Sequence, residues 1–489
     1  MNATRKVAVV LPVTRAEVSA LDRLVAMVKE GKDKPFCGDF GKFERELKER
    51  LDAVGRELVG DELAKANVDA PAVRVGTTDY RKVLGSTETY ITTFGDVSVY
   101  RTLYKDRGDP LEHAVAMLEL RVGIIGGLWT PEAAKQGTWV VAQMTPGLAE
   151  ELFKRVGNLT PSKSSLDRLP KEISARWEDD RKAFEDQLRA SLVVPKDAVS
   201  VAMSLDGVLV PMKDAEGDVP REQSADNEGP TGGPAGYREV GCATVTFYDD
   251  AGEMLSAVRM ARMPQEKKVD LKEMLLAEMA VVYQQRPDLQ VIKVADACLD
   301  NWTFLSKRVR EGKEVVDYWH AMEHLNTALQ AAHGEGTGVQ RRKFAELGDV
   351  LLTEPGGVDQ VIVALRELHD ALPKRQAKGR GVLAREIKFF TKNKRRMLYA
   401  SLRANFLPVG SGPQEACCKT LAAQRMKQSG MRWGDDGGQA ILTTRGWSQS
   451  DRFDEAWALV AATYQLEVTV MTNVVELATH RNHAKTKSR

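Results

Sequence analysis

Cysteine is scarce in this chain of 489 residues: there are five, and no two of them have the Cys-x-x-Cys spacing of a zinc site or redox motif. Few cysteines, odd in number, are typical of a protein kept in a reducing compartment. No apolar run approaches the roughly 18 residues of a membrane span. The N-terminus lacks the long apolar core and cleavage site of a signal peptide. We therefore expect a cytoplasmic protein without a membrane partner.

Net charge is nearly absent as well, with 70 Lys and Arg against 69 Asp and Glu, so overall charge indicates no nucleic-acid partner. The distribution is uneven, because residues 373–403 hold eleven basic residues and one acid, Glu386. Such a run is typical of a solvated helical face, but beside a carboxylate site it favours a phosphate-binding surface. The hydrophobic fraction of 43% allows sizeable cores, and the length predicts roughly two to four domains.

Three acids lie at the ends of predicted elements. Asp206 and Asp296 each follow a short apolar strand-like run, although Asp206-Gly207 alone is also typical of a hairpin turn. Glu415 follows a Gly-Ser-Gly-Pro turn and falls in the first turn of a predicted helix, where the helix dipole favours a carboxylate. Two aspartates on strands and one glutamate on a helix are how a ribonuclease-H-like site gathers oxygen ligands for two magnesium ions.

Several short motifs accompany these acids in order, within residues 200–445. They are Asp206-Gly207, Val294-Ala295-Asp296, Asp317-Tyr318-Trp319-His320, Gly410-Ser411-Gly412 through Glu415 to Lys419, Gln424-Arg425, and Ser429-Gly430-Met431-Arg432-Trp433. On these residues the chain resembles the DDE transposases of bacterial insertion sequences, most closely the Kra-type family, which is related to the Mutator-like elements.

The resemblance implies a function, partners and cofactors. The function would be to bind transposon-end DNA, hydrolyse phosphodiester bonds at the ends and join the 3′-OH to target DNA. The implied cofactors are two Mg²⁺ or Mn²⁺ ions. The implied partner is double-stranded DNA, both terminal inverted repeats and target, in a nucleoid-associated bacterial setting. A homodimer is expected because two ends must be joined together.

The resemblance also assigns roles to residues. Asp206, Asp296 and Glu415 would be catalytic and would hold the metal. Asp317 and His320 would support the active site, with contact to DNA as the alternative role of His320. The residues expected to contact DNA are Trp319, Lys392, Lys394, Arg395, Arg396, Lys419, Arg425 and Arg432. Trp319 would stack on an unpaired base if exposed, whereas packing in the core is the ordinary alternative.

His320 and His324 lie four residues apart, as in zinc metalloproteases. Those enzymes carry a glutamate directly after the first histidine, but here Glu323 precedes the second, so a protease is disfavoured. A capped surface helix is the other interpretation. Relatives carry cysteines that can hold zinc after a small hairpin, and this chain has residues 104–108 there instead, so no zinc is expected.

The predicted fold is α/β, with a ribonuclease-H-like mixed sheet, an all-α insertion domain and a mainly helical N-terminal DNA-binding region. In the core we expect three strands, a helix over 267–286, a strand over 290–295 and a fifth strand over 314–318. The predicted divisions are a helical leader (1–80), a β-hairpin plus helical region (81–195), the first part of the core (196–320), the insertion (321–404), the last part of the core with the Glu415 helix (405–470) and a basic tail (471–489).

Two features of the N-terminal half are predicted within these divisions. Alternating residues over 89–101 predict a hairpin turning at Gly95-Asp96. Short helices with Pro and Ser or Thr at their starts suit a helix-turn-helix, with 162–176 as the recognition helix. A plain helical bundle fits the same pattern.

Other functions fit parts of the sequence. A ribonuclease-H-like nuclease or resolvase would share the acids, and strand transfer from pre-nicked ends would separate it from a transposase. A non-catalytic DNA-binding protein derived from a transposase would lack magnesium-dependent nicking. A helical scaffold without nucleic acid would fail a gel shift.

Overall fold

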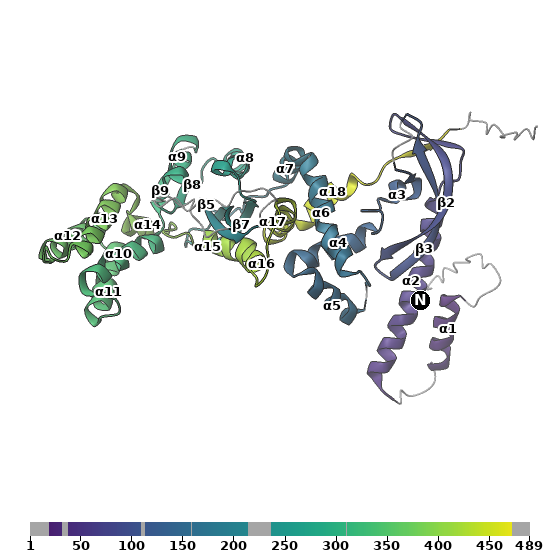
Figure 1. Ribbon diagram of the computed structural model, residues 1–489, viewed down its shortest axis with the longest axis horizontal. Helices are drawn as coiled ribbons and strands as arrows, with labels where there is room; N and C mark the ends of the chain where they lie inside the picture. Colours follow the sequence, from purple (N-terminus) through teal and green to yellow (C-terminus); the bar gives the residue numbers. More distant parts are fainter. Residues whose placement is uncertain are drawn as a thin grey trace, which may run out of the picture. The chain divides into compact units, whose positions relative to one another are not determined.

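The fold was analysed in a computed structural model, which describes residues 19–31, 38–108, 113–157, 159–213, 236–309 and 311–471 (Figure 1). The chain divides into two compact units. The first comprises the described residues of Met1–Gln136, Glu150–Lys163 and Ala461–Arg489, and the second those of Gly137–Ala149 and Ser164–Val460. No described helix is long and apolar enough to cross a membrane.

The first unit contains a five-stranded antiparallel sheet in the order β10-β1-β2-β3-β4. Its strands are β1 (Ala72–Val75), β2 (Thr78–Thr92), β3 (Gly95–Asp106), β4 (Val115–Ala116) and β10 (Val468–Val470), and the helices α1 (Ala20–Gly31) and α2 (Phe40–Ala66) precede them. Strand β1 and the start of β2 therefore fall within the stretch predicted as a helical leader. Thr92 pairs with Gly95, so the hairpin turns at Thr93-Phe94, two residues before the predicted turn.

Helices follow the first sheet along the chain. They are α3 (Met117–Val122), α4 (Pro131–Gln143), α5 (Pro146–Val156), α6 (Lys163–Asp179) and α7 (Arg181–Ala190). Proline opens α4 and α5, as predicted, because its fixed φ suits the first helical position and its missing N–H costs nothing there. The predicted recognition helix over 162–176 corresponds to α6, which buries Leu166, Ile173 and Trp177 on one face.

The second unit is built on a mixed sheet in the order β7-β6-β5-β8-β9. Its strands are β5 (Ser200–Pro211), β6 (Tyr237–Tyr248), β7 (Met254–Arg262), β8 (Gln290–Ala295) and β9 (Lys313–Val316). β6 runs antiparallel to both β5 and β7, whereas β5, β8 and β9 are parallel. The predicted succession of three strands, a helix, a strand and a fifth strand is confirmed, with α8 (Val269–Gln285) and α9 (Leu299–Arg308) between them.

Asp206-Gly207 lies inside β5, with Asp206 opposite Cys242 of β6, so the hairpin-turn alternative is excluded. The glycine has a steric reason. A Cβ at position 207 would lie 1.7 Å from the side-chain oxygen of Glu239 on β6. The aspartate therefore lies in the middle of the strand, and a larger residue at position 207 would displace the Glu239 side chain.

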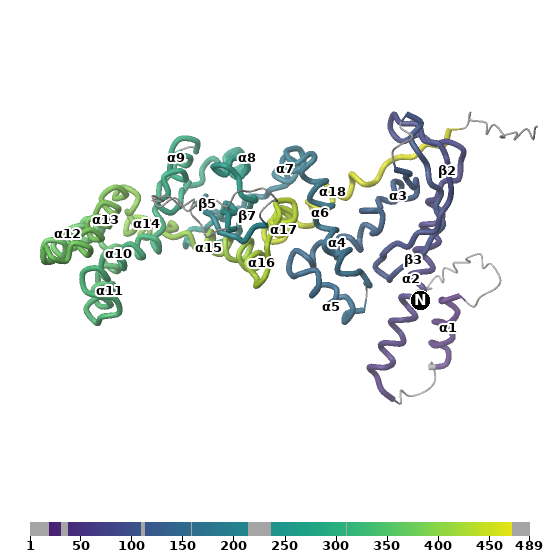
Figure 2. The backbone as a smooth tube through the Cα atoms, viewed as in Figure 1, coloured from purple at the N-terminus to yellow at the C-terminus, as the bar shows by residue number. Residues whose placement is uncertain are grey.

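The two faces of this sheet are covered by different helices. Ala243 packs with Leu271 and Leu275 of α8 on one face. Its neighbour Cys242 packs with Leu421 on the other, because successive side chains of a strand point to opposite faces. The second face is covered by α15 (Gly412–Cys417), a π-helical segment η3 (Cys418–Ala423), α16 (Gln424–Met426) and α17 (Asp435–Gln449), seen beside β5 and β7 in Figure 2.

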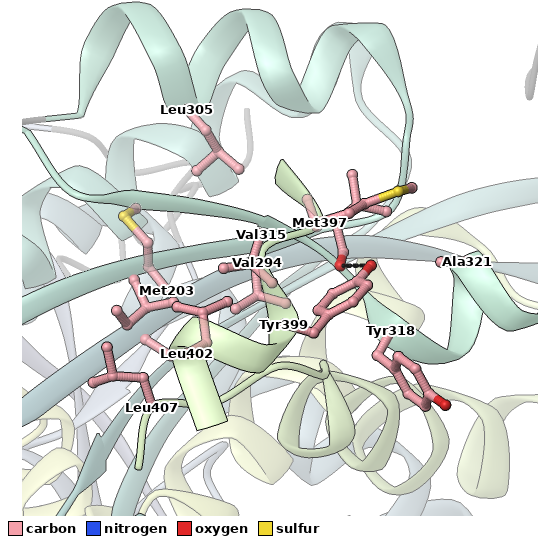
Figure 3. Close-up of a cluster of buried hydrophobic side chains, with 14 of the residues drawn as sticks. Met203, Val294, Leu305, Val315, Tyr318, Ala321, Met397, Tyr399, Leu402 and Leu407 are labelled. Carbon is pink, nitrogen blue, oxygen red and sulfur yellow. Dashed lines mark hydrogen bonds between the residues drawn. The ribbon is translucent and has the colours of Figure 1, made fainter. Parts of the chain in front are cut away.

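A helical segment lies between β9 and α15 in the sequence, as predicted for the insertion (Figure 1). It consists of α10 (Tyr318–His333), α11 (Gly338–Thr353), α12 (Gly357–Ala371), α13 (Ala377–Asn393), a short 3-10 turn η2 (Lys394–Arg396) and α14 (Tyr399–Ala404). Its core is continuous with that of the sheet. Tyr399 is fully buried, and its hydroxyl donates to the carbonyl of Val316 at 2.9 Å (Figure 3).

The last helix of the chain's described residues is α18 (Phe453–Ala462), which begins in the second unit and ends in the first. The predicted basic tail lies outside the described residues from position 472 onward and stays a prediction.

Candidate active site

A cavity of about 190 Å³ lies at the edge of the mixed sheet where β5 and β8 meet α10 and α15. Its lining residues are Leu205, Asp206, Val294, Ala295, Asp296, Asp317, Trp319, His320, Glu323, Ser411, Gln414 and Glu415. The three acids predicted to be catalytic, from distant parts of the sequence, thus line one cavity. Asp317, Trp319 and His320, also predicted near the site, line it with them.

Asp206 and Asp296 are brought together by strand register. Ser204 of β5 pairs with Val294 of β8 in parallel orientation, and each aspartate lies two residues further along its strand direction. Burial is the main cause that raises the pKa of Asp206 to about 6, and the nearby Asp296 carboxylate adds to it. The Asp296 carboxylate therefore disfavours the ionisation of Asp206 in this shared site.

Asp296 is held from three directions. Its Oδ1 accepts hydrogen bonds from the side chain of Asn301 at 3.0 Å and the backbone N–H of Cys298 at 3.2 Å. The indole of Trp302 donates to its carbonyl at 2.5 Å. Arg396, predicted to contact DNA, lies 4.1 Å from the Trp302 ring and donates to Glu314 at 2.8 Å. Arg396 is thus engaged inside the protein by Trp302 and Glu314.

Asp317 links two elements at the cavity wall. It is 3% exposed, and its Oδ1 accepts from the backbone N–H of His320 at 2.7 Å, which caps α10. Its Oδ2 accepts from the backbone N–H of Ser411, the residue before α15. The neighbouring Tyr318 N–H donates to the carbonyl of Val409 at 3.1 Å. One buried carboxylate thus ties the start of α10 to the turn that carries Glu415.

Glu415 is exposed in the first turn of α15, and its N–H donates to Ser411 at 2.8 Å. Burial, then Asp317 and Glu323, raise its pKa above the ordinary value. Gln414 beside it is 2% exposed. Its amide donates to the carbonyl of Cys242 at 3.0 Å and accepts from the Thr244 hydroxyl at 3.1 Å, which fixes α15 on β6.

Sequence reasoning missed Gln414, Asn301 and Trp302 as supports of the acids. Gln414 precedes Glu415 directly, and its polarity within a segment that packs on a sheet was the available signal. The other two lie in a predicted helix just after Asp296. Their partners, however, could not be read from the sequence.

The two histidines of α10 have different surroundings. His320 lines the cavity, with its Nδ1 3.5 Å from Glu323. His324 lies 2.5 Å from the buried carboxylate of Glu386 on α13 and stacks on Phe389 at 3.5 Å between ring centroids. His324 is thus tied to the helix that carries Glu386, whereas His320 faces the cavity.

Trp319 is 60% exposed at the rim of this cavity, so the packed-core alternative is excluded. Four of the cations predicted to contact DNA are exposed as well: Lys392, Arg395, Lys419 and Arg432. Lys394 is exposed but lies 2.5 Å from Asp359. Arg425 is a correction: it is 3% exposed, 5.3 Å from the Trp433 ring, and burial lowers its pKa to about 10. It is packed inside and is not available to a phosphate.

The donors of the cavity fit a hard divalent cation. Asp206, Asp296 and Glu415 offer carboxylate oxygens, the ligands Mg²⁺ and Mn²⁺ prefer, and no lysine or arginine is among the lining residues. A cation would offset the effect of burial, the main cause of the raised pKa of Asp206, and would screen the smaller effect of Asp296. As the side chains stand, no three His, Cys, Asp or Glu of the described residues are gathered closely enough to hold an ion. Binding would therefore require side-chain rotation, for which the exposed Glu415 is free.

Comparisons with known proteins add little to this geometry. No family model matches the chain, and no curated protein matches its sequence. Among solved structures the chain is similar to the Drosophila P element transposase strand transfer complex, at 11% identity over 70% of this chain and 82% of that chain, with a TM-score of 0.26. A likeness at this level carries no functional argument, so the proposal below rests on the site.

Proposed function

We propose that this chain is a DDE transposase, with a ribonuclease-H-like core, that cuts transposon ends and joins them to target DNA. The observation that carries the proposal is that Asp206, Asp296 and Glu415 line one cavity although they are far apart in the sequence. Two lie on adjacent parallel strands and the third on a helix over the same sheet. The strand order, with only β6 antiparallel to the central strand, supports a ribonuclease-H-like core.

The metal ions would be held by Asp206, Asp296 and Glu415. Bound there, a pair of cations supplies activation of the attacking oxygen and stabilisation of the leaving one in an in-line displacement at phosphorus. The chain's own residues do the rest. Asp317 and Gln414 fix the turn and helix that carry Glu415, and Asn301 orients Asp296.

One site can serve both steps of the proposed reaction. Hydrolysis at the end of the element and attack by the new 3′-OH on target DNA are both substitutions at a phosphorus atom. The same oxygen ligands therefore suit both, with water as the nucleophile in the first and the 3′-OH in the second. A homodimer, with one such site for each end, follows from the need to join two ends.

The DNA would be held by Trp319 at the cavity rim and by exposed cations of the second unit. Trp319 offers a flat apolar surface at the rim, suited to stacking on an unpaired base. Lys392 and Arg395 are exposed where α13 runs into the next turn, and Lys419 and Arg432 follow Glu415. These cations can neutralise phosphates without reading the sequence.

The test is magnesium-dependent nicking of DNA that carries the inverted repeats flanking the coding region. The variants D206N and E415Q should lose nicking while they keep DNA binding. E367Q, which changes an exposed glutamate of α12, is the matched control and should nick normally.

Pre-nicked end DNA then separates the competing functions. Joining of the 3′-OH to a target plasmid supports a transposase. Nicking without joining would make the chain a nuclease or resolvase. Binding without nicking, in the wild type as in D206N, would leave a non-catalytic DNA-binding protein.

A further inference from the structure

The helix that carries Glu415 is irregular directly after it. α15 continues into η3, a π-helical segment over Cys418–Ala423, and then into α16. A π turn closes hydrogen bonds one residue further along than an α turn. The turn thus holds one residue more than an α turn. This rotates the residues before it by roughly 100° about the helix axis, compared with their direction in an uninterrupted α-helix.

This rotation bears on the direction of Glu415. Beyond the π turn the helix is anchored, because Met426 of α16 is fully buried in the cluster that joins it to the sheet and α17. With that end fixed, an uninterrupted α-helix would turn Glu415 away from its present face. Gln414 holds α15 on β6 before the turn. The π turn thus lets Glu415 face the cavity while Met426 stays packed after it.

Arg445 of α17 holds the π turn. Its side chain is buried, with 5% of the residue exposed, and its guanidinium donates to three backbone carbonyls. Nε donates to Leu421 at 3.0 Å and Nη2 to Thr420, both within η3, while Nη1 donates to Ala142 at 2.5 Å. Carbonyls inside a regular helix need no such side-chain donor, since the backbone satisfies them.

A second contact from α17 reaches the same turn. The Thr420 hydroxyl lies 2.8 Å from the side-chain oxygen of Gln449 and 2.7 Å from the carbonyl of Ala416. Two residues of one helix, Arg445 and Gln449, therefore meet a single π turn. This concentration of side-chain contacts is expected where the helical ladder is disrupted.

We propose that Arg445 is a positioning residue, which keeps the π turn in place and thereby directs Glu415 into the cavity with Asp206 and Asp296. This inference rests on the proposed function of that cavity. Arg445 does not line the cavity, so it acts only through the helix.

The experiment compares R445K with R189K in the full chain. Lysine keeps the charge but cannot reach several carbonyls at once. Arg189 is the matched control, because it is 7% exposed and pairs with Glu185 and Asp186 of its own helix, α7. Three quantities are measured: the melting temperature, amide hydrogen exchange over 418–424, and the Mn²⁺ concentration that half-saturates the site.

R445K should speed amide exchange over 418–424 and raise the half-saturating Mn²⁺ concentration at least tenfold. R189K should change neither, even where it lowers the melting temperature as much. T420V, which removes the second contact and leaves Arg445 in place, should shift both readouts in the same direction by less. If R445K does not fold, T420V still tests the proposal.

Three results would overturn the proposal, and they differ from one another. Unchanged exchange in R445K and T420V would mean that Arg445 does not hold the turn. Faster exchange with wild-type Mn²⁺ binding would mean that the turn does not direct Glu415. Equal Mn²⁺ binding by the wild type and E415Q would remove the metal site itself, and the proposed function with it.

Discussion

Asp206 and Asp296 lie side by side because β5 and β8 run parallel with Ser204 opposite Val294, two residues before each aspartate. This register places two carboxylates at one edge of the sheet, and the pKa of Asp206 rises to about 6 through burial and through Asp296. Without a cation, the ionised Asp206 carboxylate therefore destabilises the folded state at neutral pH.

Replacement of Asp206 by Asn should therefore stabilise the metal-free protein at pH 7. The pKa of Asp206 is about 6 in the fold against 3.8 ordinarily, so the folded state binds this proton more tightly than the unfolded state. That stabilisation is present below about pH 4 and is lost as the pH rises through about 6. At pH 7 the difference corresponds to at most about 3 kcal/mol in the free energy of unfolding.

Urea denaturation of the wild type and D206N at pH 4 and pH 7, with and without Mg²⁺, measures this effect. The advantage of D206N should be present at pH 7, shrink towards pH 4 and be offset by Mg²⁺, which only the wild type binds well. A D206N protein less stable than the wild type at pH 7 without metal would contradict the burial argument.

Replacement of Asp317 by Ala should lower the free energy of unfolding and weaken the metal site together. It removes the cap of α10 and the acceptor of the Ser411 N–H, and a lost cap alone costs about 1 to 2 kcal/mol. The measurements are denaturation and Mn²⁺ titration. T337A is the control, since Thr337 caps α11 through Gln340 at 3.2 Å and is not among the residues lining the cavity. Equal Mn²⁺ binding by D317A and T337A would restrict Asp317 to a structural role.

Replacement of Trp319 by Ala should weaken binding of end DNA that has an unpaired flank by about 1 to 3 kcal/mol, since stacking on one base is lost. Stability should hardly change, because the side chain is 60% exposed. Fluorescence anisotropy with flanked and fully paired DNA measures the difference. W139A removes another exposed tryptophan, at 49%, and should leave both affinities unchanged. An equal loss for the two DNAs in W319A would argue against stacking.

Replacement of Lys392 or Arg395 by Ala should reduce the salt dependence of DNA binding, by about one unit of slope for each lost phosphate contact. R396A is the contrasting variant. Because Arg396 contacts Trp302 and Glu314, it should lose stability and keep the salt slope. Binding isotherms over a range of salt concentrations decide the matter. A slope that falls in R396A and stays unchanged in K392A would reverse this assignment.

Part of the fold and of the site could be predicted because short stretches of the sequence specify it. Parallel strands buried on both faces are apolar runs, so β8 was predicted with its observed bounds. The Gly-Ser-Gly-Pro turn marked the start of α15 and the position of Glu415. Three acids at the ends of such elements were enough to predict one shared site.

Long-range packing accounts for what the sequence did not reveal. Charge suggested that Arg425 is exposed, but it packs on Trp433. Gly95 suggested the turn of the first hairpin, but the turn lies at Thr93-Phe94, where Phe94 fills the space beside Gly55 of α2. The π turn depends on Arg445, a residue of another helix, so no local pattern announces it.

The antiparallel pairing of β1 with β10 has a consequence for biosynthesis. Val73 lies opposite Val470 and Val75 opposite Val468, so β1 acquires this neighbour only after the residues between the two strands have been translated. Until then β1 is an edge strand whose outward-facing backbone N–H and C=O groups are unpaired. Strands of other newly made chains can pair with these groups. The second unit, encoded between the two partners, can form in the interval. Expression yield should therefore depend on how fast the ribosome delivers residues 468–470.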